Sequence, residues 1–455
     1  MDKRLLLAAL TLIPLGGCRS AQGADSKDAS PVAASEPVPA PPPPKEAKPE
    51  CAAPDKEKIA RFDCSNSKVV KTPVPEIVDP HHTLDPFYDR ILQLARGTTK
   101  DRVRIAIYGD SNLTSDFLPG HLRRVLQGRF GDGGHGYISF SRPWGSYRHE
   151  DVESKGFWPM FKLYAPTTHT VKDREYGFAN MAAESNEVGA AAWAGTTKDA
   201  KAKVGQNVSS FDIYFLKQPY GGQFDVKLDG KVVRTVKTRA EEFEAGFEEV
   251  DAGGDGPHEV RVEVKGNGPV RFFGTSLDRP GPSIQIDSLG AGALQYERMS
   301  WVRDDIRKPQ WQRRNYDLVI IWLGMNVMFV PPNRDYAKSV LASLKDALPK
   351  TPVLILGPGD TAKEGKTTSD PRIIAVDKQM REVADETGVA FWDFRDAMGG
   401  DGSIIGFTKR GLTGEDHIHF GPEGSALMGN RLMCAMFDDL NAHLEKVPDA
   451  GCSQP

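Results

Sequence analysis

The sequence places a serine where an apolar stretch runs into a glycine turn. Residues 105–112 read Ile-Ala-Ile-Tyr-Gly-Asp-Ser-Asn, and the seventh of them is Ser111. A serine hydroxyl becomes a useful nucleophile when it has a neighbouring base, a group that orients the base, and donors for an oxyanion. Taken alone, Ser111 would more often be a turn residue, because serine is common after a strand. The hypothesis that Ser111 is a nucleophile therefore depends on partners elsewhere in the chain.

Candidates for each partner occur far along the chain. Asp416 and His419 lie in a predicted loop before the last helix, and residues three apart can face the same way, so that the carboxylate holds one tautomer of the imidazole. Asn326 follows an apolar strand, at the sheet edge where open α/β proteins bind ligands. Gly290 and Gly292 could offer backbone N–H groups. These residues would give Ser111 a base, an orienting carboxylate and oxyanion donors.

We expect no metal and no organic cofactor. His417 stands two residues before His419 and could suggest a metal pair, but no third clear ligand accompanies them. No pair of cysteines or histidines has the spacing of a zinc site. We therefore interpret His417 as a surface side chain, and His81, His82 and His135 as capping or surface residues.

The elements that must position these residues follow an α/β pattern. A helix that starts near Pro86 leads into a strand at 103–108, and an amphipathic helix follows it. Later, residues 318–323 and 353–356 are continuous apolar runs, as found in parallel strands covered on both faces. Helical segments alternate with them, and the last helix covers about 422–444. The pattern predicts an α/β fold with a parallel sheet.

The helical pattern is absent from residues 151–284. Residues 211–216, 224–228 and 258–264 alternate apolar and polar side chains, and Asp229-Gly230 is a strong hairpin turn. These features predict an inserted β-sandwich or jelly-roll module. The irregular stretch at 150–210 is assigned to the same module.

The N-terminus has the features of a lipoprotein signal. Residues 1–17 combine a basic start, a short apolar run and Leu-Gly-Gly directly before Cys18. The apolar run is too short to span a bilayer. The small residues before Cys18 suit cleavage there, so we expect lipidation of Cys18. Arg19-Ser20 lacks the acidic residue that resembles an inner-membrane retention signal. We therefore expect the anchor to lie in an outer membrane, facing the periplasm.

The predicted boundaries follow from these patterns. Residues 18–74 carry the anchor cysteine and a Pro/Ala-rich linker that we expect to be disordered. The α/β domain is discontinuous, at 75–150 and 285–446, and 447–455 form a tail. Four further cysteines, an even number in an oxidising compartment, permit two disulfides, and three connectivities are open for Cys51, Cys64, Cys434 and Cys452.

Composition excludes some partners. The chain has 455 residues, of which 39% are hydrophobic and 26% charged, as in ordinary globular proteins. The net charge of -4 and the scattered lysines and arginines give no reason to expect nucleic acid or an anionic surface as a partner. We expect a monomer.

The motifs, in this order, resemble the SGNH/GDSL hydrolases. The matching stretches are Gly109-Asp110-Ser111, residues 287–292, Gly324-Met325-Asn326 and residues 416–419. The resemblance implies a three-layer α/β/α sandwich with a parallel sheet. It also implies Ser111 as nucleophile, His419 as base and Asp416 as the residue that orients it. The implied oxyanion hole consists of the Ser111 and Gly292 N–H groups and the Asn326 amide.

A β module between the serine block and the glycine block is similar to the peptidoglycan O-acetylesterases of Gram-negative bacteria. Residues 130–137 and 288–292 resemble segments of those enzymes, and Asn112 stands where a histidine or leucine is usual, which we expect to alter the pocket wall. In those enzymes the module looks like a carbohydrate-binding fold. Aromatic residues of this region could stack on sugars, although we expect them in a core: Trp144, Trp158, Trp193 and Tyr220.

The resulting expectation is a lipid-anchored envelope esterase that removes O-acetyl groups from a polysaccharide, and peptidoglycan is the substrate we expect. Two alternatives remain open. An O-acetyltransferase would use the same acetyl-serine and pass it to a sugar hydroxyl. A catalytically inactive lipoprotein would bind a glycan without hydrolysing it.

Overall fold

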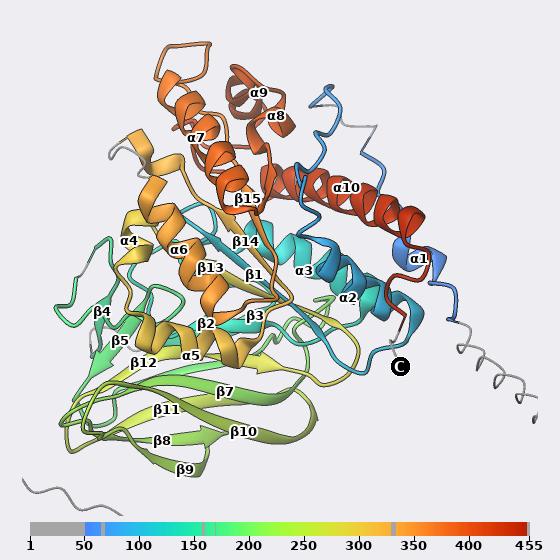
Figure 1. Ribbon diagram of the computed structural model, residues 1–455. Helices are drawn as coiled ribbons and strands as arrows, with labels where there is room; N and C mark the ends of the chain where they lie inside the picture. The colour runs from blue at the N-terminus through green and yellow to red at the C-terminus, as the bar shows by residue number, and fades with distance from the viewer. Residues whose placement is uncertain (1–50, 65–68, 157–159, 169, 329–333, 453–455) are drawn as a thin grey trace, which may run out of the picture. The chain divides into compact units, whose positions relative to one another are not determined.

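A computed structural model describes residues 51–64, 69–156, 160–168, 170–328 and 334–452 (Figure 1). Cys18 and the predicted signal and lipid anchor lie outside these residues, as does Trp158. Residues from Cys51 onward form one compact unit. None of the helices in the described ranges is long and apolar enough to cross a membrane.

A parallel sheet lies at the centre of the part that carries Ser111. Its strand order is β13-β1-β14-β15-β16, and every neighbouring pair is parallel. The strands are β1 (Val103–Gly109), β13 (Ile284–Gly290), β14 (Leu318–Trp322), β15 (Val353–Leu356) and β16 (Ala390–Trp392). Nearly every residue in them is buried, as expected when helices cover both faces.

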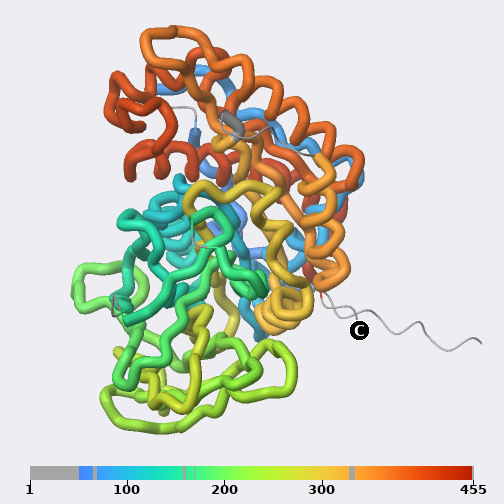
Figure 2. Tube along the Cα trace, turned by 90° about the vertical axis from the view of Figure 1, so that its left-hand side faces the viewer, coloured from blue at the N-terminus to red at the C-terminus, as the bar shows by residue number. Residues whose placement is uncertain are grey.

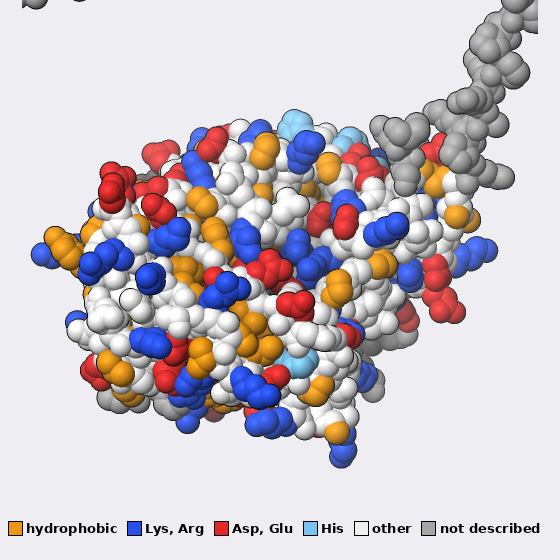
Figure 3. All heavy atoms as spheres, turned by 90° about the horizontal axis from the view of Figure 1, so that it is seen from below, with side chains coloured by type: hydrophobic (Ala, Val, Ile, Leu, Met, Phe, Trp, Pro, Cys, Tyr) orange, Lys and Arg blue, Asp and Glu red, His pale blue; other side chains and the backbone are white. Residues whose placement is uncertain are grey.

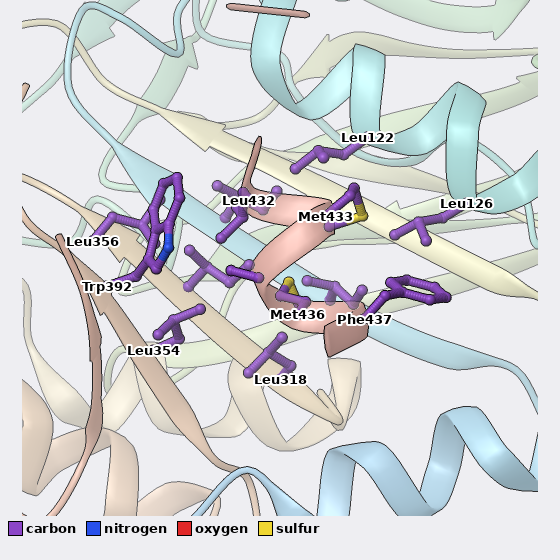
Figure 4. Close-up of a cluster of buried hydrophobic side chains, with 14 of the residues drawn as sticks. Leu122, Leu126, Leu318, Leu354, Leu356, Trp392, Leu432, Met433, Met436 and Phe437 are labelled. Carbon is purple, nitrogen blue, oxygen red and sulfur yellow. The ribbon is translucent and has the colours of Figure 1, made fainter. Parts of the chain in front are cut away.

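One face of the sheet is covered by helices α2 (Asp85–Arg96), α3 (Phe117–Phe130) and α10 (Pro422–Lys446). The short helices α8 (Phe394–Met398) and α9 (Ser403–Lys409) also contribute to this core. Figure 4 shows Leu122 of α3 and Met433 of α10 in the cluster that contains Leu318 of β14. Helix α2 has the predicted ends, with Pro86 in its first turn and Gly97 closing it in the left-handed conformation.

The other face is covered by α4 (Tyr296–Ser300), α5 (Asp304–Arg314), α6 (Arg334–Ala347) and α7 (Pro371–Thr387) (Figure 1). Strand β14 has apolar side chains on both faces of the sheet, and helices bury both sets. Leu318 and Ile320 point into the first core, whereas Val319 and Ile321 point into the second. The α/β fold with a parallel sheet is therefore confirmed.

Between β1 and β13 the chain forms two antiparallel sheets. In the described residues the first has six strands, β2 (Gly136–Ser139), β4 (Lys162–Tyr164), β5 (Ala182–Ser185), β7 (Val208–Lys217), β10 (Glu244–Gly256) and β12 (Val270–Asp278). The second has five, β3 (Val152–Gly156), β6 (Ala191–Thr196), β8 (Gln223–Leu228), β9 (Lys231–Lys237) and β11 (Glu259–Gly266). Figure 2 shows these strands below the helices of the parallel sheet.

The two antiparallel sheets share a core in which Phe272 of β12 packs against Phe224 of β8, with ring centroids 4.8 Å apart. The predicted hairpin joins β8 to β9, and Asp229 and Gly230 both have positive φ. The face in Figure 3 carries basic and acidic side chains side by side. This face therefore has no single-sign field of the kind that nucleic acid requires.

The antiparallel part begins earlier than the predicted boundary at 151. Strand β2 (Gly136–Ser139) pairs with β12, so residues 136–150 belong with these strands. The glycine-rich turn before β2 makes the close approach possible. A Cβ on Gly134, whose φ is +96°, would lie 2.3 Å from the Leu277 carbonyl oxygen. The stretch at 150–210, predicted to be irregular, contains β3 to β6.

The predicted disorder of 18–74 is wrong for its described C-terminal part. Asp55 caps the short helix α1 (Lys56–Ile59), and the Phe62 ring packs edge-on against Phe437 at 4.9 Å. The described part of the predicted tail, residues 447–452, is also held, because the Arg96 guanidinium donates to the Ala450 carbonyl at 2.9 Å. Two disulfides join these ends, Cys51–Cys452 and Cys64–Cys434. Of the three connectivities that the sequence leaves open, the structure therefore has one that links the N-terminal segment to the C-terminal segment. This packing was not predicted because the N-terminal segment contains few large apolar residues.

Candidate active site

The sheet register brings three turns together. Gly109, the last residue of β1, lies opposite Gly290 of β13 on one side and Trp322 of β14 on the other. Ser111 therefore follows the central strand of the three, while the predicted glycine and asparagine follow its two neighbours. Since the carboxyl ends of parallel strands share one edge, the segments after them converge there.

The turn that presents Ser111 is tight. Leu113 N donates to the Asp110 carbonyl at 3.0 Å, which folds Leu113 back over the strand ends. A Cβ on Gly109 would lie 2.4 Å from Leu113 Cδ1, and one on Gly290 would lie 2.5 Å from the Leu113 carbonyl carbon. Both glycines are thus required by close packing around the serine.

Ser111, His419 and Asp416 form a continuous chain of hydrogen bonds. Ser111 Oγ lies 2.8 Å from His419 Nε2, and His419 Nδ1 lies 2.6 Å from Asp416 Oδ2. Partial burial acts to raise the pKa of Asp416, but hydrogen bonds from the His419 ring and from the backbone amides of His419 and Ile418 outweigh it and lower the pKa. The carboxylate therefore stays charged beside the imidazole. This is the arrangement that lets a histidine take a proton from a serine.

The loop that carries His419 is fastened to the serine turn by Asn112. The buried Asn112 side chain accepts a hydrogen bond from Phe420 N at 3.0 Å through its Oδ1. The expectation that Asn112 alters the pocket wall missed this contact, which joins residues far apart in sequence. His417 lies apart from the serine, because its Nδ1 bonds Thr408 Oγ1 at 2.7 Å.

On the other side of Ser111, a buried carboxylate holds the Asn326 amide. Asn326 lies in a short 3₁₀ helix, η1 (Met325–Met328), and its Nδ2 donates to Asp110 Oδ2 at 3.0 Å. The second Asn326 contact, to the Leu294 carbonyl, is long at 3.4 Å. Burial raises the pKa of Asp110 to about 6, although hydrogen bonds from Asn112 and Asn326 and the charge of His419 act in the opposite direction. Sequence reasoning assigned Asp110 no role beyond its motif.

Gly292 lies in a turn directly after β13. Ala291 N donates to the Gly109 carbonyl at 3.0 Å, and Leu294 N donates to the Ala291 carbonyl at 3.1 Å. Within the described ranges, the N–H groups of Ser111 and Gly292 have no protein acceptor. Two free backbone donors therefore lie in the turns that follow adjacent strands. The Asn326 amide adds a third N–H group, which makes only the long 3.4 Å contact to Leu294. Such donors can hold the negative oxygen of a tetrahedral intermediate.

A cluster of Asp116, His135 and the partly buried His149 has potential ligand atoms within 4.8 Å of one another. The Arg123 guanidinium bonds both oxygens of Asp116, at 2.9 and 3.3 Å, so this carboxylate already pairs with a cation. His135 was predicted at the surface but is buried, and its Nε2 bonds His149 Nδ1 at 2.9 Å. Burial lowers the pKa of His149 to about 4. The cluster is thus a neutral histidine pair beside an ion pair.

A comparison with known protein families agrees with an ester hydrolase. Residues 257–427 match the GDSL-like Lipase/Acylhydrolase family. The matched range contains Gly292, Asn326, Asp416 and His419, whereas Ser111 precedes it. The chain therefore carries a GDSL-like lipase/acylhydrolase domain and is a carboxylic ester hydrolase. None of the curated proteins matches the sequence.

Solved structures resemble this chain to different degrees. A peptidoglycan O-acetylesterase captured in action aligns with 80% of this chain and 99% of its own, with a TM-score of 0.67 and 20% identity. A family two carbohydrate esterase from Clostridium thermocellum with cellohexaose covers 57% of this chain and 95% of its own, at 12% identity and a TM-score of 0.26. Its counterpart from Cellvibrio japonicus covers 64% and 99%, also at 12% identity, with a TM-score of 0.24. The first of these establishes the fold.

Proposed function

We propose that this protein is a serine esterase that removes O-acetyl groups from a cell-envelope polysaccharide, with peptidoglycan as its substrate. The observation that carries the proposal is the 2.8 Å contact between Ser111 Oγ and His419 Nε2, with Asp416 2.6 Å from the other ring nitrogen. The free N–H groups of the adjacent turns support it, because acyl transfer through a serine requires both kinds of group.

The reaction follows from this arrangement. His419 Nε2 takes the Ser111 proton as Oγ attacks the acetyl carbonyl carbon, and Asp416 stabilises the imidazolium. The carbonyl oxygen becomes an oxyanion, which is held by the N–H groups of Ser111 and Gly292 and by the Asn326 amide. When the intermediate collapses, the sugar oxygen leaves with the proton from His419, and an acetyl-serine remains. Water activated by His419 then releases acetate and restores the serine.

Two features support a polymeric, acetylated glycan as the substrate. The side chains of His419 and Asp416 are 49% and 46% exposed, so the acid–base side of the site is open to a large molecule. The fold is that of a solved structure described as a peptidoglycan O-acetylesterase. A short acetyl group needs little of the chain beyond the serine turn, which leaves the surrounding surface to the glycan.

The proposed location is the cell envelope, with a lipid anchor on Cys18 in the outer membrane. The basic start and apolar run before Cys18 support export and lipidation. The disulfides Cys51–Cys452 and Cys64–Cys434 support an oxidising compartment. Replacement of Cys18 by alanine is expected to release the protein from membranes. Unchanged membrane retention of the Cys18→Ala chain would contradict the anchor.

The proposed activity is tested by acetate release from O-acetylated peptidoglycan and from p-nitrophenyl acetate. We expect Ser111→Ala to lower both rates by at least about 10³-fold, since removal of a triad residue costs this much or more. Ser209→Ala is the matched control, because Ser209 bonds Asp255 in the antiparallel part, and it should keep wild-type rates. Undiminished acetate release by Ser111→Ala would refute the proposal.

The same assay separates the alternatives. Transfer of acetyl to added chito-oligosaccharide in place of acetate release would identify an O-acetyltransferase. Glycan binding without hydrolysis of either ester would identify a binding protein. Release from acetylated xylan but not from acetylated peptidoglycan would keep the esterase and replace the substrate.

A further inference from the structure

The turn that carries Gly292 contains a residue in an unfavourable backbone conformation. Ala293, the next residue, has a φ of +55°, a left-handed conformation that is unfavourable for a residue with a Cβ. The turn is closed by the hydrogen bond from Leu294 N to the Ala291 carbonyl, and Ala291 N bonds the Gly109 carbonyl of the parallel sheet. Such a conformation persists only when surrounding groups impose it. Contacts from other parts of the chain therefore help to hold the Gly292 peptide units.

One of these groups is Thr167, which lies between β4 and β5 of the antiparallel part. Its hydroxyl donates to the Gly292 carbonyl oxygen at 2.7 Å. Thr167 lies within a turn in which Thr168 N donates to the Ala165 carbonyl at 3.3 Å, and Ala165 is fully buried. The Thr167 hydroxyl thus belongs to a segment that packing holds in place. Its bond fixes the peptide unit on the C-terminal side of Gly292.

The second group is the indole of Trp144, which lies between β2 and β3. A Cβ on Gly292 would lie 2.5 Å from both Cε2 and Nε1 of Trp144, so the ring covers the face of Gly292 where a side chain would stand. The ring is partly buried and packs with the buried residues Tyr147 and Met181. This contact restricts rotation of the glycine and keeps water from that face.

The segment that carries Trp144 is also bonded to the serine turn. Ser146 Oγ lies 2.9 Å from Thr114 Oγ1, and Arg148 N donates to the Thr114 carbonyl at 2.9 Å. Thr114 Oγ1 in turn donates to the Ser111 carbonyl at 2.9 Å. In Figure 2 this blue-green to green part of the chain lies between the yellow-green antiparallel strands and the orange and red helices. One segment therefore contacts both the nucleophile turn and the glycine turn.

We propose that Thr167 and Trp144 are positioning residues that aim the Gly292 N–H at the oxyanion, so that the antiparallel part contributes to the chemical step itself. The inference rests on the proposed esterase function. It means that the antiparallel part acts on every acetyl ester, including those too small to reach any glycan-binding surface. The oxyanion exists only in the transition state and the intermediate. A Gly292 N–H group that no longer points at the oxyanion therefore lowers kcat and leaves KM nearly unchanged.

Thr167→Val tests the hydrogen bond, because valine keeps the shape of threonine and removes the donor. Direct loss of an oxyanion donor costs about 10²- to 10³-fold in kcat, and we expect misplacement of one to cost about tenfold with p-nitrophenyl acetate. Thr167→Ser retains the hydroxyl and should keep kcat within about twofold of wild type. Thr170→Val is the matched control on the same segment, and Thr170 is exposed. It should behave as wild type.

A double-mutant cycle tests the ring. Gly292→Ala should be strongly impaired, because the added Cβ meets the Trp144 indole. Trp144→Gly opens that space, so the double variant should lose less activity than the product of the two single losses. This cycle remains informative if Thr167→Val fails to fold, which its melting curve would show.

The outcomes separate this inference from the function on which it rests. Activity retained in Ser111→Ala would overturn the esterase proposal. An inactive Ser111→Ala together with a Thr167→Val that folds and has wild-type kcat, or that raises KM alone, would overturn the positioning role and leave the esterase intact. Strictly multiplicative losses in the cycle would overturn the role of Trp144.

Discussion

The two sides of Ser111 are built in opposite ways. On the acid–base side, the His419 and Asp416 side chains are about half exposed, at 49% and 46%. On the oxyanion side, Asp110 is 1% exposed, and Gly292 is buried in a turn attached to the parallel sheet. The first side lies on a loop before a helix, whereas the second is made from the ends of adjacent strands.

This difference matches what each side must do. The base has to receive water and release protons, so contact with solvent does not harm it. Donors to an oxyanion act best where water is excluded and the local dielectric is low, and they must be oriented before the charge develops. We infer that a small molecule from solution can take the place of a side chain deleted on the exposed side. On the buried side it cannot. The following predictions test that contrast.

The largest effect is expected on the exposed side. His419→Ala should lower kcat by about 10³-fold or more, because Ser111 loses its base. Added imidazole should restore part of the rate, since the histidine side chain leaves a gap that is open to solvent. The measurement is p-nitrophenyl acetate hydrolysis with and without imidazole. His417→Ala, whose ring bonds Thr408, is the control and should remain active. A His419→Ala chain with an undiminished rate would contradict the assignment of the base.

A smaller loss is expected on the buried side. Asn326→Ala should lower kcat by about 10²-fold with little change in KM, as expected when one oxyanion donor is removed. Formamide or acetamide should not restore the rate, because the amide is held between Asp110 and the Leu294 carbonyl. Asn430→Ala removes an exposed amide that bonds His121 and serves as the control. Efficient rescue of Asn326→Ala by free amides would contradict the contrast between the two sides.

The smallest effect on rate is expected at Asp110, whose contribution is clearer in stability. Burial raises the pKa of Asp110 to about 6, above its ordinary value of 3.8. Between these two pH values the folded protein holds a proton that the unfolded chain has lost. This group's contribution to stability is therefore fully present below about pH 4 and is lost as the pH rises through about 6, by about 3 kcal/mol in all.

Asp110→Asn, which cannot titrate there, removes this contribution and keeps one of the two acceptor oxygens that now bond Asn112 N and Asn326 Nδ2. Chemical denaturation at pH 4 and pH 7 measures the difference. Relative to Asp110→Asn, the wild-type free energy of unfolding should fall between the two pH values, and kcat should change by less than about tenfold. Parallel stability profiles of the two proteins would show that Asp110 does not titrate in this range.

The parts of the site that could be predicted are those that follow from local pattern and from sheet geometry. The apolar runs at 103–108 and 318–323 indicate buried parallel strands, and their carboxyl ends share an edge. Ser111 and Asn326 had to approach each other once both strands were assigned. The Asp416 and His419 pair could be found because its spacing is short enough to be read in the sequence.

The rest depends on contacts between segments that no periodicity relates. The bond from Phe420 to Asn112 and the bond from Thr167 to Gly292 join residues more than a hundred positions apart. The packing of residues 51–64 depends on disulfides whose connectivity three arrangements could satisfy. Strand β2 was missed because glycines before it, which read as a break, allow close approach to the Leu277 backbone.

The central claim is that Ser111 forms the covalent acyl intermediate. Its most direct test is to treat the protein with a p-nitrophenyl phosphonate ester, which traps a serine nucleophile as a stable adduct, and to locate the added mass by peptide mass spectrometry. We predict one adduct per chain, on the peptide that contains Ser111, and none in Ser111→Ala. Complete inactivation with the adduct on another residue, or with Ser111 unmodified, would contradict the account.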